Sequence, residues 1–350
     1  MIVYTELDPR TRRSLEDIQQ RYASGKPSVV IADMAGELLV ESTASPLPVV
    51  LSEISHAYTL AMVLRECDRG AISPDTPIAD ILPLDIVSGL CVIGDRDLSS
   101  SITIEHLLSH QSGIPDFYHR RKPGTISFSM QTTMRDRKWN LEQALEIAKH
   151  YPGVFPPGSR GKIHYSLTNY ALLGAILQES TGMNYDQLIN LRVVVPLGLK
   201  GTFVFTEAHY DRYFSLAAIH RGVDTLRIPR TLASFGAAGS VVATPKDMVT
   251  FWRALVRGEL FDASWIEFLH TDPRKLFANT FMTKGLMVPA QSRRRSSTLA
   301  YAGSSGQAVI SDESRGVIAF LALNTVSEPH DSLALVSTLV TSMPPVSSSD

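Results

Sequence analysis

The sequence predicts an α/β domain combined with an all-α subdomain: an antiparallel β-sheet, built from both ends of the chain and flanked by helices, with an inserted block of helices. Two observations support this fold class. Short β-rich segments lie near both ends of the chain, within residues 29–51 and 301–324. Helical patterns broken by proline and glycine fill residues 76–230. The α/β domain is therefore expected to be discontinuous, formed by residues 1–75 and 231–350.

The N-terminal region predicts a helix followed by three short strands. Residues 12–24 are charged and compatible with a helix, which Lys26-Pro27 ends because the residue before a proline is pushed out of the α region. Val29–Ala32 and Leu38–Glu41 flank a short glycine turn, which is typical of a β-hairpin. Pro48–Leu51 is a third extended segment.

The next segment predicts a largely buried helix. Between residues 53 and 70, apolar side chains recur near helical spacing with few polar interruptions, and Gly70 ends the pattern. Ser52, immediately before it, is the expected N-cap. Further helices are expected at residues 103–110, 140–150, 168–181, 244–257 and 333–340, and further strands at residues 301–303, 307–311 and 316–324.

Charge and composition exclude several classes of protein. Lys and Arg total 33 against 35 Asp and Glu, so no bulk positive field exists to hold a phosphate backbone, and we expect no nucleic-acid partner. No apolar run reaches the ~18 residues that a spanning helix needs, and a signal-peptide pattern is lacking, so we expect a cytoplasmic protein without a membrane partner. Cys67 and Cys91 have no zinc-finger or disulfide-framework spacing.

Three segments, in order along the chain, carry a resemblance to a known family. They are Ile102–Pro115, Tyr165–Gly174 and Gly236–Asp247, with the helix of residues 53–70 before them and Tyr301-Ala-Gly303 after them. Together they resemble the β-lactamase and penicillin-binding-protein superfamily, in particular its class C-like esterase and acyltransferase branch. The resemblance covers most of the chain. It implies a β-lactamase/transpeptidase-like fold with the active site in the cleft between an α/β domain and a helical domain.

The catalytic positions of that family are altered at the start of the buried helix. Members of the family use a Ser-x-x-Lys motif there. Counting back from Gly70, which matches the glycine that ends the motif helix, places Glu53 at the nucleophile and His56 at the lysine. Residues at i and i+3 are neighbours on a helix, so we expect the carboxylate and the imidazole to hydrogen-bond.

The two other motifs of the family are altered as well. In its Tyr-x-Asn motif the tyrosine is kept as Tyr165, but Leu167 replaces the asparagine. On the strand that carries Lys-Thr-Gly or His-x-Gly, Tyr301 replaces the basic residue and Gly303 is kept. We expect Leu167, Gly303 and Ser304 to contribute to substrate binding, in a pocket less polar than one that hydrolyses β-lactams.

The leading functional prediction is an enzyme that performs non-covalent general acid/base chemistry on a small, largely apolar molecule. Glu53 and His56 would abstract a proton, Tyr165 would donate or orient, and Tyr301 would hydrogen-bond a developing oxyanion. Isomerisation, cyclisation, elimination or dehydration all fit, and analogy with related scaffolds suggests natural-product biosynthesis. We expect no cofactor and no metal, and the sequence specifies no oligomeric state.

Three alternatives stay open. The first is a serine hydrolase or acyltransferase that uses a displaced nucleophile, Ser52 or Ser55. The second is a metal site made by Glu53, His56 and His164. The third is a catalytically inactive binding protein that uses the old cleft. Arg293–Arg295 is interpreted as a solvated loop, with attraction of an anionic substrate as a minor alternative.

Overall fold

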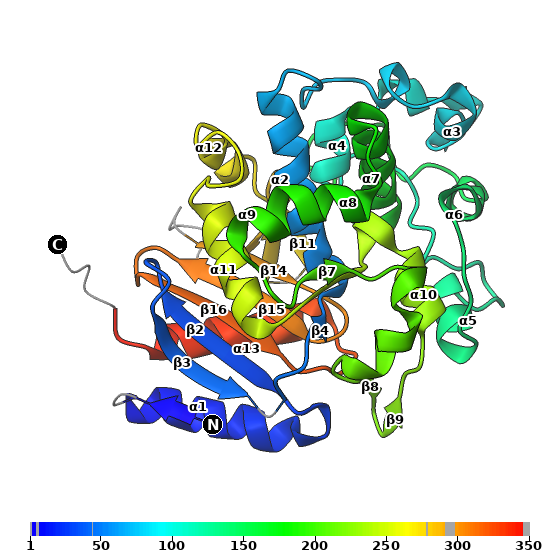
Figure 1. Cartoon of the computed structure of the whole chain (residues 1–350). Coiled ribbons are helices and arrows are strands. Elements are labelled where there is room, and N and C mark those ends of the chain that lie inside the picture. Colours follow the sequence, from blue (N-terminus) through cyan, green and yellow to red (C-terminus); the bar gives the residue numbers. More distant parts are fainter. Residues whose placement is uncertain (1, 5–6, 44, 278, 291–297, 346–350) are drawn as a thin grey trace.

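The computed structural model describes residues 2–4, 7–43, 45–277, 279–290 and 298–345, so Arg293–Arg295 lies outside the described residues. Within them, a nine-stranded antiparallel sheet has the strand order β1-β3-β2-β16-β15-β14-β13-β12-β11 (Figure 1). Strand β2 joins the two ends of the chain by pairing with β16, Val30 opposite Phe320. The predicted sheet built from both termini is therefore confirmed. Its strands are β1 (Ile2–Tyr4), β2 (Ser28–Asp33), β3 (Leu38–Thr43), β11 (Arg274–Phe277), β12 (Thr280–Met282), β13 (Met287–Pro289), β14 (Thr298–Ala302), β15 (Gln307–Asp312) and β16 (Val317–Ala322).

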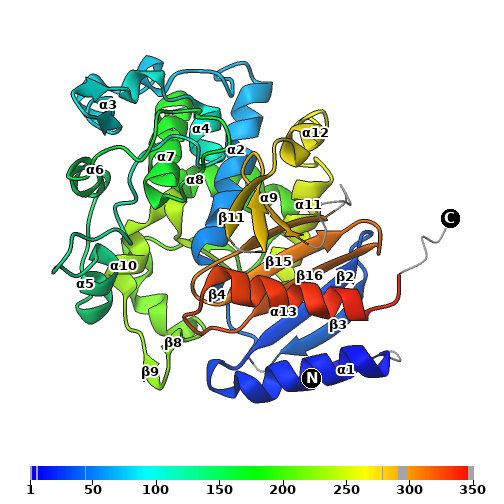
Figure 2. The same ribbon diagram turned by 180° about the vertical axis from the view of Figure 1, so that it is seen from behind.

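Helices cover both faces of this sheet. Helix α13 (Pro329–Ser342) crosses strands β14, β15 and β16 on one face, with α1 (Pro9–Arg21) beside it (Figure 2). Helix α11 (Pro245–Val256) packs on the opposite face, against β2, β15 and β16. Every residue of β14, β15 and β16 is consequently buried, and β14 and β16 are nearly continuous apolar runs.

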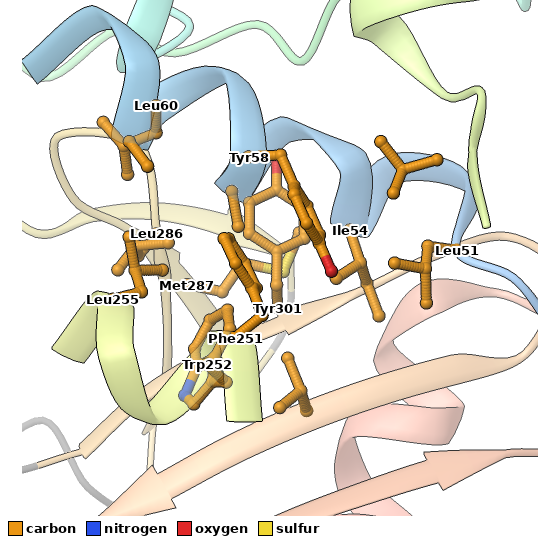
Figure 3. Close-up of a cluster of buried hydrophobic side chains, with 14 of the residues drawn as sticks. Leu51, Ile54, Tyr58, Leu60, Phe251, Trp252, Leu255, Leu286, Met287 and Tyr301 are labelled. Carbon is orange, nitrogen blue, oxygen red and sulfur yellow. The ribbon is translucent and has the colours of Figure 1, made fainter. Parts of the chain in front are cut away.

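Helix α2 (Ser55–Asp68) is the buried helix that the apolar pattern predicts. Its Tyr58 ring stacks on Phe251 of α11 with centroids 3.6 Å apart, and Trp252 and Leu286 extend the same cluster (Figure 3). All of its first ten residues, Ser55–Leu64, are buried, because the sheet lies on one side and the helical block on the other. The N-terminal half of α2 is thereby fixed in the core.

The expected N-cap is wrong. A 3₁₀ turn, η2 (Ser52–Ile54), precedes α2, and no side chain caps either element. Ser52 has a positive φ of 48°, and its hydroxyl lies 2.5 Å from the hydroxyl of Ser305. That tertiary partner competes successfully with the backbone N–H groups that an N-cap would bind.

The block between α2 and α11 contains the helices predicted at residues 103–110, 140–150 and 168–181, observed as α4, α6 and α7. A small sheet, β4-β10-β7, lies beside it. The division of domains at residues 75 and 231 stays a prediction.

Among the described helices, none is both long and apolar enough to cross a bilayer. The remaining elements are η1 (Ala23–Gly25), β4 (Val49–Val50), η3 (Ile78–Asp80), α3 (Leu84–Val87), β5 (Val92–Ile93), β6 (Arg96–Asp97), η4 (Ser99–Ser101), α4 (Ile104–Leu108), α5 (Phe128–Met134), α6 (Leu141–Lys149), α7 (Leu167–Thr181), α8 (Tyr185–Ile189), the π-turn η5 (Asn190–Val194), α9 (Val195–Leu197), β7 (Phe203–Val204), η6 (Glu207–Ser215), β8 (His220–Arg221), β9 (Asp224–Thr225), α10 (Pro229–Ser234), η7 (Gly236–Ala238), β10 (Val241–Ala243) and α12 (Trp265–His270).

Candidate active site

A cavity of about 790 Å³ lies where η2, the loop after β14 and the helical block meet. One wall is apolar and belongs to a small buried cluster packed beneath η6 and α10, including Val50, Tyr213 and Leu232. The polar and charged side chains on the remainder, which also includes apolar residues, are Ser52, Glu53, Asp116, Tyr118, His119, Arg120, Ser129, Thr133, His164, Tyr165, Arg221, Ser304, Ser305, Ser327 and Glu328. The cavity has the size and mixed lining of a small-molecule site.

Glu53 lies on the cavity and is only 6% exposed. Its Oε2 accepts a hydrogen bond from the backbone N–H of Ser304 at 2.7 Å and another from the Ser304 hydroxyl at 3.1 Å. Gly303 allows this approach, because a Cβ atom there would lie 2.9 Å from the carbonyl oxygen of Leu51 and 3.2 Å from Glu53 Oε2. The loop after β14 therefore holds the carboxylate in place.

His56 does not face the cavity. Its Nε2 donates to the carbonyl oxygen of Ala238 at 3.2 Å, so Nδ1 accepts from the hydroxyl of Tyr301 at 2.7 Å. The ring stacks on Tyr170 with centroids 3.6 Å apart. Burial, together with the nearby His110, lowers the pKa of His56 well below its usual value. His56 is a neutral imidazole buried under the site.

The expected hydrogen bond between Glu53 and His56 is not formed in the described structure, and this prediction is wrong. Each group has a partner from a distant segment: Ser304 for the carboxylate, and Tyr301 with Ala238 for the imidazole. The i, i+3 spacing allows the pair but does not enforce it. Tertiary hydrogen bonds decide the orientation of both side chains.

The structure separates the other predicted residues into two layers. Tyr165, Leu167 and Ser304 line the cavity with Glu53. Tyr301 is fully buried, and Gly303 lies beneath the carboxylate. The hydroxyl of Tyr165 lies 3.5 Å from His56 Nδ1, so Tyr165 connects the two layers. Burial raises the pKa of Tyr165 and of Tyr301 well above the usual tyrosine value, which keeps both as neutral phenols.

Sequence reasoning missed the hydrogen-bond network around His110. Its Nδ1 accepts from the backbone N–H of Ser166 at 3.2 Å and from Asn169 Nδ2 at 3.1 Å. The ring packs on Tyr165 with centroids 4.3 Å apart. Burial, and secondarily the charge of His164, lowers the pKa of His110 to about 3. A histidine inside the Ile102–Pro115 motif was the signal that could have identified it.

Sequence reasoning also missed the pair formed by Asp116 and His119. Asp116 Oδ2 accepts from the backbone N–H of His119 at 2.8 Å and from its Nδ1 at 2.9 Å. Asp116 Oδ1 accepts from the N–H of Leu167 at 3.0 Å, so the same carboxylate caps α7. The Asp-x-x-His spacing directly after the motif was the available signal.

The displaced serines and the metal alternative find little support. The Ser55 hydroxyl is fully buried and accepts from the N–H of Val241 at 3.0 Å, away from the cavity. Ser52 lies on the cavity, but its hydroxyl pairs with Ser305. Within the described residues, no three His, Cys, Asp or Glu side chains are grouped to hold a metal ion.

The site therefore combines a fixed carboxylate, a phenol hydroxyl and an imidazole held by a second carboxylate, on a sheet-and-helix scaffold of the transpeptidase type. These features define the β-lactamase/transpeptidase-like class of fold. Comparison with family models agrees. The chain belongs to the family described as Beta-lactamase, whose model matches residues 54–339.

The chain is also similar to individual proteins of known name, at 25–30% identity. The chain is 30% identical over 206 residues to penicillin-binding protein 4 of Amycolatopsis lactamdurans, covering 57% of this chain and 48% of that protein. It is 25% identical over 218 residues to the D-alanyl-D-alanine-carboxypeptidase/endopeptidase AmpH of Escherichia coli K12, covering 61% and 50%. The chain thus spans about half the length of these relatives.

A solved structure shows the same fold. The crystal structure of a D-amino acid amidase from Ochrobactrum anthropi SV3 aligns with a TM-score of 0.72, covering 94% of this chain and 98% of that one at 20% identity. The predicted superfamily and fold class are both confirmed.

Proposed function

We propose that this chain is an enzyme that hydrolyses a small carboxylic ester or amide, with Glu53 as general base. One observation carries the proposal: a largely buried carboxylate, that of Glu53, is held by Ser304 on the wall of a cavity. The sequence resemblance, counted back from Gly70, aligns this residue with the nucleophile of the family. The apolar wall favours a substrate with an apolar group. Hydrolytic names among the relatives support hydrolysis and provide no counterpart for isomerisation, cyclisation, elimination or dehydration.

The proposed reaction uses water as the nucleophile. Glu53 removes a proton from a water molecule while the water oxygen attacks the carbonyl carbon of the substrate. The Tyr165 hydroxyl donates a hydrogen bond to the carbonyl oxygen as negative charge develops there. The bond to the leaving group then breaks, which yields an acid and an alcohol or amine. Tyr301 has no part in this proposal, because its hydroxyl is buried and donates to His56.

A second candidate is acyl transfer through a displaced serine, and a specific contact favours Ser304 for it. Ser304 lines the cavity, and its hydroxyl donates to Glu53 Oε2 at 3.1 Å. A carboxylate in that place can take the hydroxyl proton as the oxygen attacks an acyl carbon. Neither serine of the original alternative, Ser52 or Ser55, has such a contact with a carboxylate.

Glu53→Gln tests the proposal, because the amide oxygen can still accept from Ser304 while its basicity is lost. We expect kcat/KM for ester and amide substrates to fall by about 100-fold or more. Glu142→Gln is the control, since Glu142 is exposed on α6 and does not line this cavity, and its effect should stay within a few-fold. The assay compares the initial rates of the three proteins on a panel of esters and amides with apolar acyl groups.

Labelling with a fluorophosphonate separates the two candidates. Water attack predicts no covalent adduct by mass spectrometry. An adduct on Ser304 that Ser304→Ala abolishes would favour the serine mechanism. If the folded protein turns over no ester or amide and forms no adduct, a binding protein without catalysis becomes the better description.

A further inference from the structure

His119 is held in one orientation on the cavity wall that also contains Glu53. Its Nδ1–H must donate to Asp116, because a carboxylate can only accept. The other ring nitrogen, Nε2, has no hydrogen-bond partner in the described part of the chain, and 49% of the side chain is exposed. The imidazole therefore has one nitrogen fixed by the protein and one available to a ligand.

Asp116 is a rigid support for this ring. It is 5% exposed, and its two oxygens accept from the backbone N–H groups of Leu167 and His119 as well as from the ring. Burial raises the pKa of Asp116, but the hydrogen bonds and charge of His119, with the Leu167 N–H, outweigh burial and the pKa is lowered. The carboxylate is consequently ionised when His119 is protonated.

The surrounding charges favour the protonated ring. Burial lowers the pKa of His119, but the hydrogen bond and charge of Asp116, followed by the charges of Glu53 and Glu328, outweigh burial and the pKa is raised. The other charged or titratable groups on the same cavity are Arg120, His164, Arg221 and the phenols Tyr118, Tyr165 and Tyr213. A raised pKa keeps the His119 ring protonated, and able to donate a proton, up to a higher pH than an ordinary histidine.

Building on the proposed hydrolysis, we propose that His119 is the general acid that protonates the leaving group. Glu53 takes one proton from the attacking water, and the carbon–oxygen or carbon–nitrogen bond of the tetrahedral intermediate breaks as His119 Nε2 gives its proton to the departing atom. An alcohol or amine leaves, a carboxylic acid remains, and the proton on Glu53 returns to His119 through solvent. No other reactant is required.

This assignment narrows the substrate class to alkyl esters and amides. Alkoxide and amide anions are poor leaving groups, so their departure requires a proton. Phenolates carrying a nitro group leave without one. A general acid therefore matters for the first kind of substrate and not for the second.

His119→Gln tests the proposal with a matched pair of substrates that share one acyl group, an alkyl ester and a nitrophenyl ester. We expect kcat/KM to fall by about 100-fold for the alkyl ester and by no more than about threefold for the nitrophenyl ester. The alkaline fall in activity on the alkyl ester should also disappear, because it reports loss of the His119 proton. His164→Gln, on the same cavity, should leave the ratio between the two substrates unchanged.

Two outcomes overturn the proposal. Equal losses on both esters in His119→Gln would assign a structural role to His119 while leaving the hydrolysis itself established. NMR titration of the His119 ring gives a readout that does not need turnover. The ring signal is assigned because it is missing from the spectrum of His119→Gln. A pKa at or below the ordinary histidine value would contradict the acid role, whereas absence of any ester turnover together with a raised His119 pKa would contradict the proposed function instead.

Discussion

His110→Asn should make the protein markedly less sensitive to mild acid. His110 is fully buried with a pKa of about 3, whereas an unfolded histidine titrates near 6.5. Below pH 6.5 the unfolded chain therefore binds a proton that the folded chain excludes, so stability is present above that pH and is lost as the pH falls. Between pH 6.5 and pH 5, at about 1.36 kcal/mol per pH unit, the loss from this single histidine is about 2 kcal/mol.

Asparagine suits this position because it keeps the acceptor and tolerates the backbone. Its side-chain oxygen can accept from Ser166 and Asn169 as the Nδ1 atom of His110 does. His110 has a φ of 56°, a left-handed conformation that asparagine adopts more readily than most residues. The variant therefore removes the titration with little change in the hydrogen bonds.

The measurement is the free energy of unfolding from urea titrations at pH 7 and pH 5, followed by circular dichroism. The wild type should lose about 2 kcal/mol more than His110→Asn over this interval. His150→Asn, at the exposed end of α6, is the control and should behave as the wild type. Equal losses in wild type and His110→Asn would refute the reasoning, because they would mean that His110 is protonated in the folded protein.

Two further substitutions test the layer beneath the cavity. Tyr301→Phe removes the hydroxyl that donates to His56 Nδ1. The free energy of unfolding, measured with urea, should fall by about 1–3 kcal/mol. A change below about 0.5 kcal/mol would show that the His56 ring finds another donor. Gly303→Ala forces a Cβ to within 2.9 Å of the Leu51 carbonyl oxygen and should displace Glu53. The free energy of unfolding should fall by about 1–3 kcal/mol, together with weaker ester turnover. An unchanged Tm would contradict the close approach.

Most of the fold follows from local pattern. The buried helix α2 and the strands β14 and β16 have largely apolar sequences, as expected of elements buried on both sides, and glycine breaks mark their ends. The start of α2 could not be placed as well. Serine is a residue type that is favoured at N-caps, but the hydroxyl of Ser52 pairs instead with that of Ser305, 253 residues further along the chain.

The candidate site was less predictable for the same reason. Four of the motif positions, Glu53, Tyr165, Leu167 and Ser304, line one cavity. The orientation of His56 depends on Tyr301 and Ala238, which are 245 and 182 residues away, and no helical spacing contains that information. Contacts made only in the folded chain also determine which carboxylate charges act on His119.

The surroundings of His56 limit which side chains this position can hold. A lysine at this position would bring an ammonium group into a fully buried space formed by the Tyr301 hydroxyl, the Ala238 carbonyl and the face of the Tyr170 ring. We therefore expect that exchanging Glu53 and His56 for serine and lysine would not by itself give a working Ser-x-x-Lys pair, because the Tyr301 hydroxyl and the Tyr170 ring surround this position as partners of a neutral imidazole.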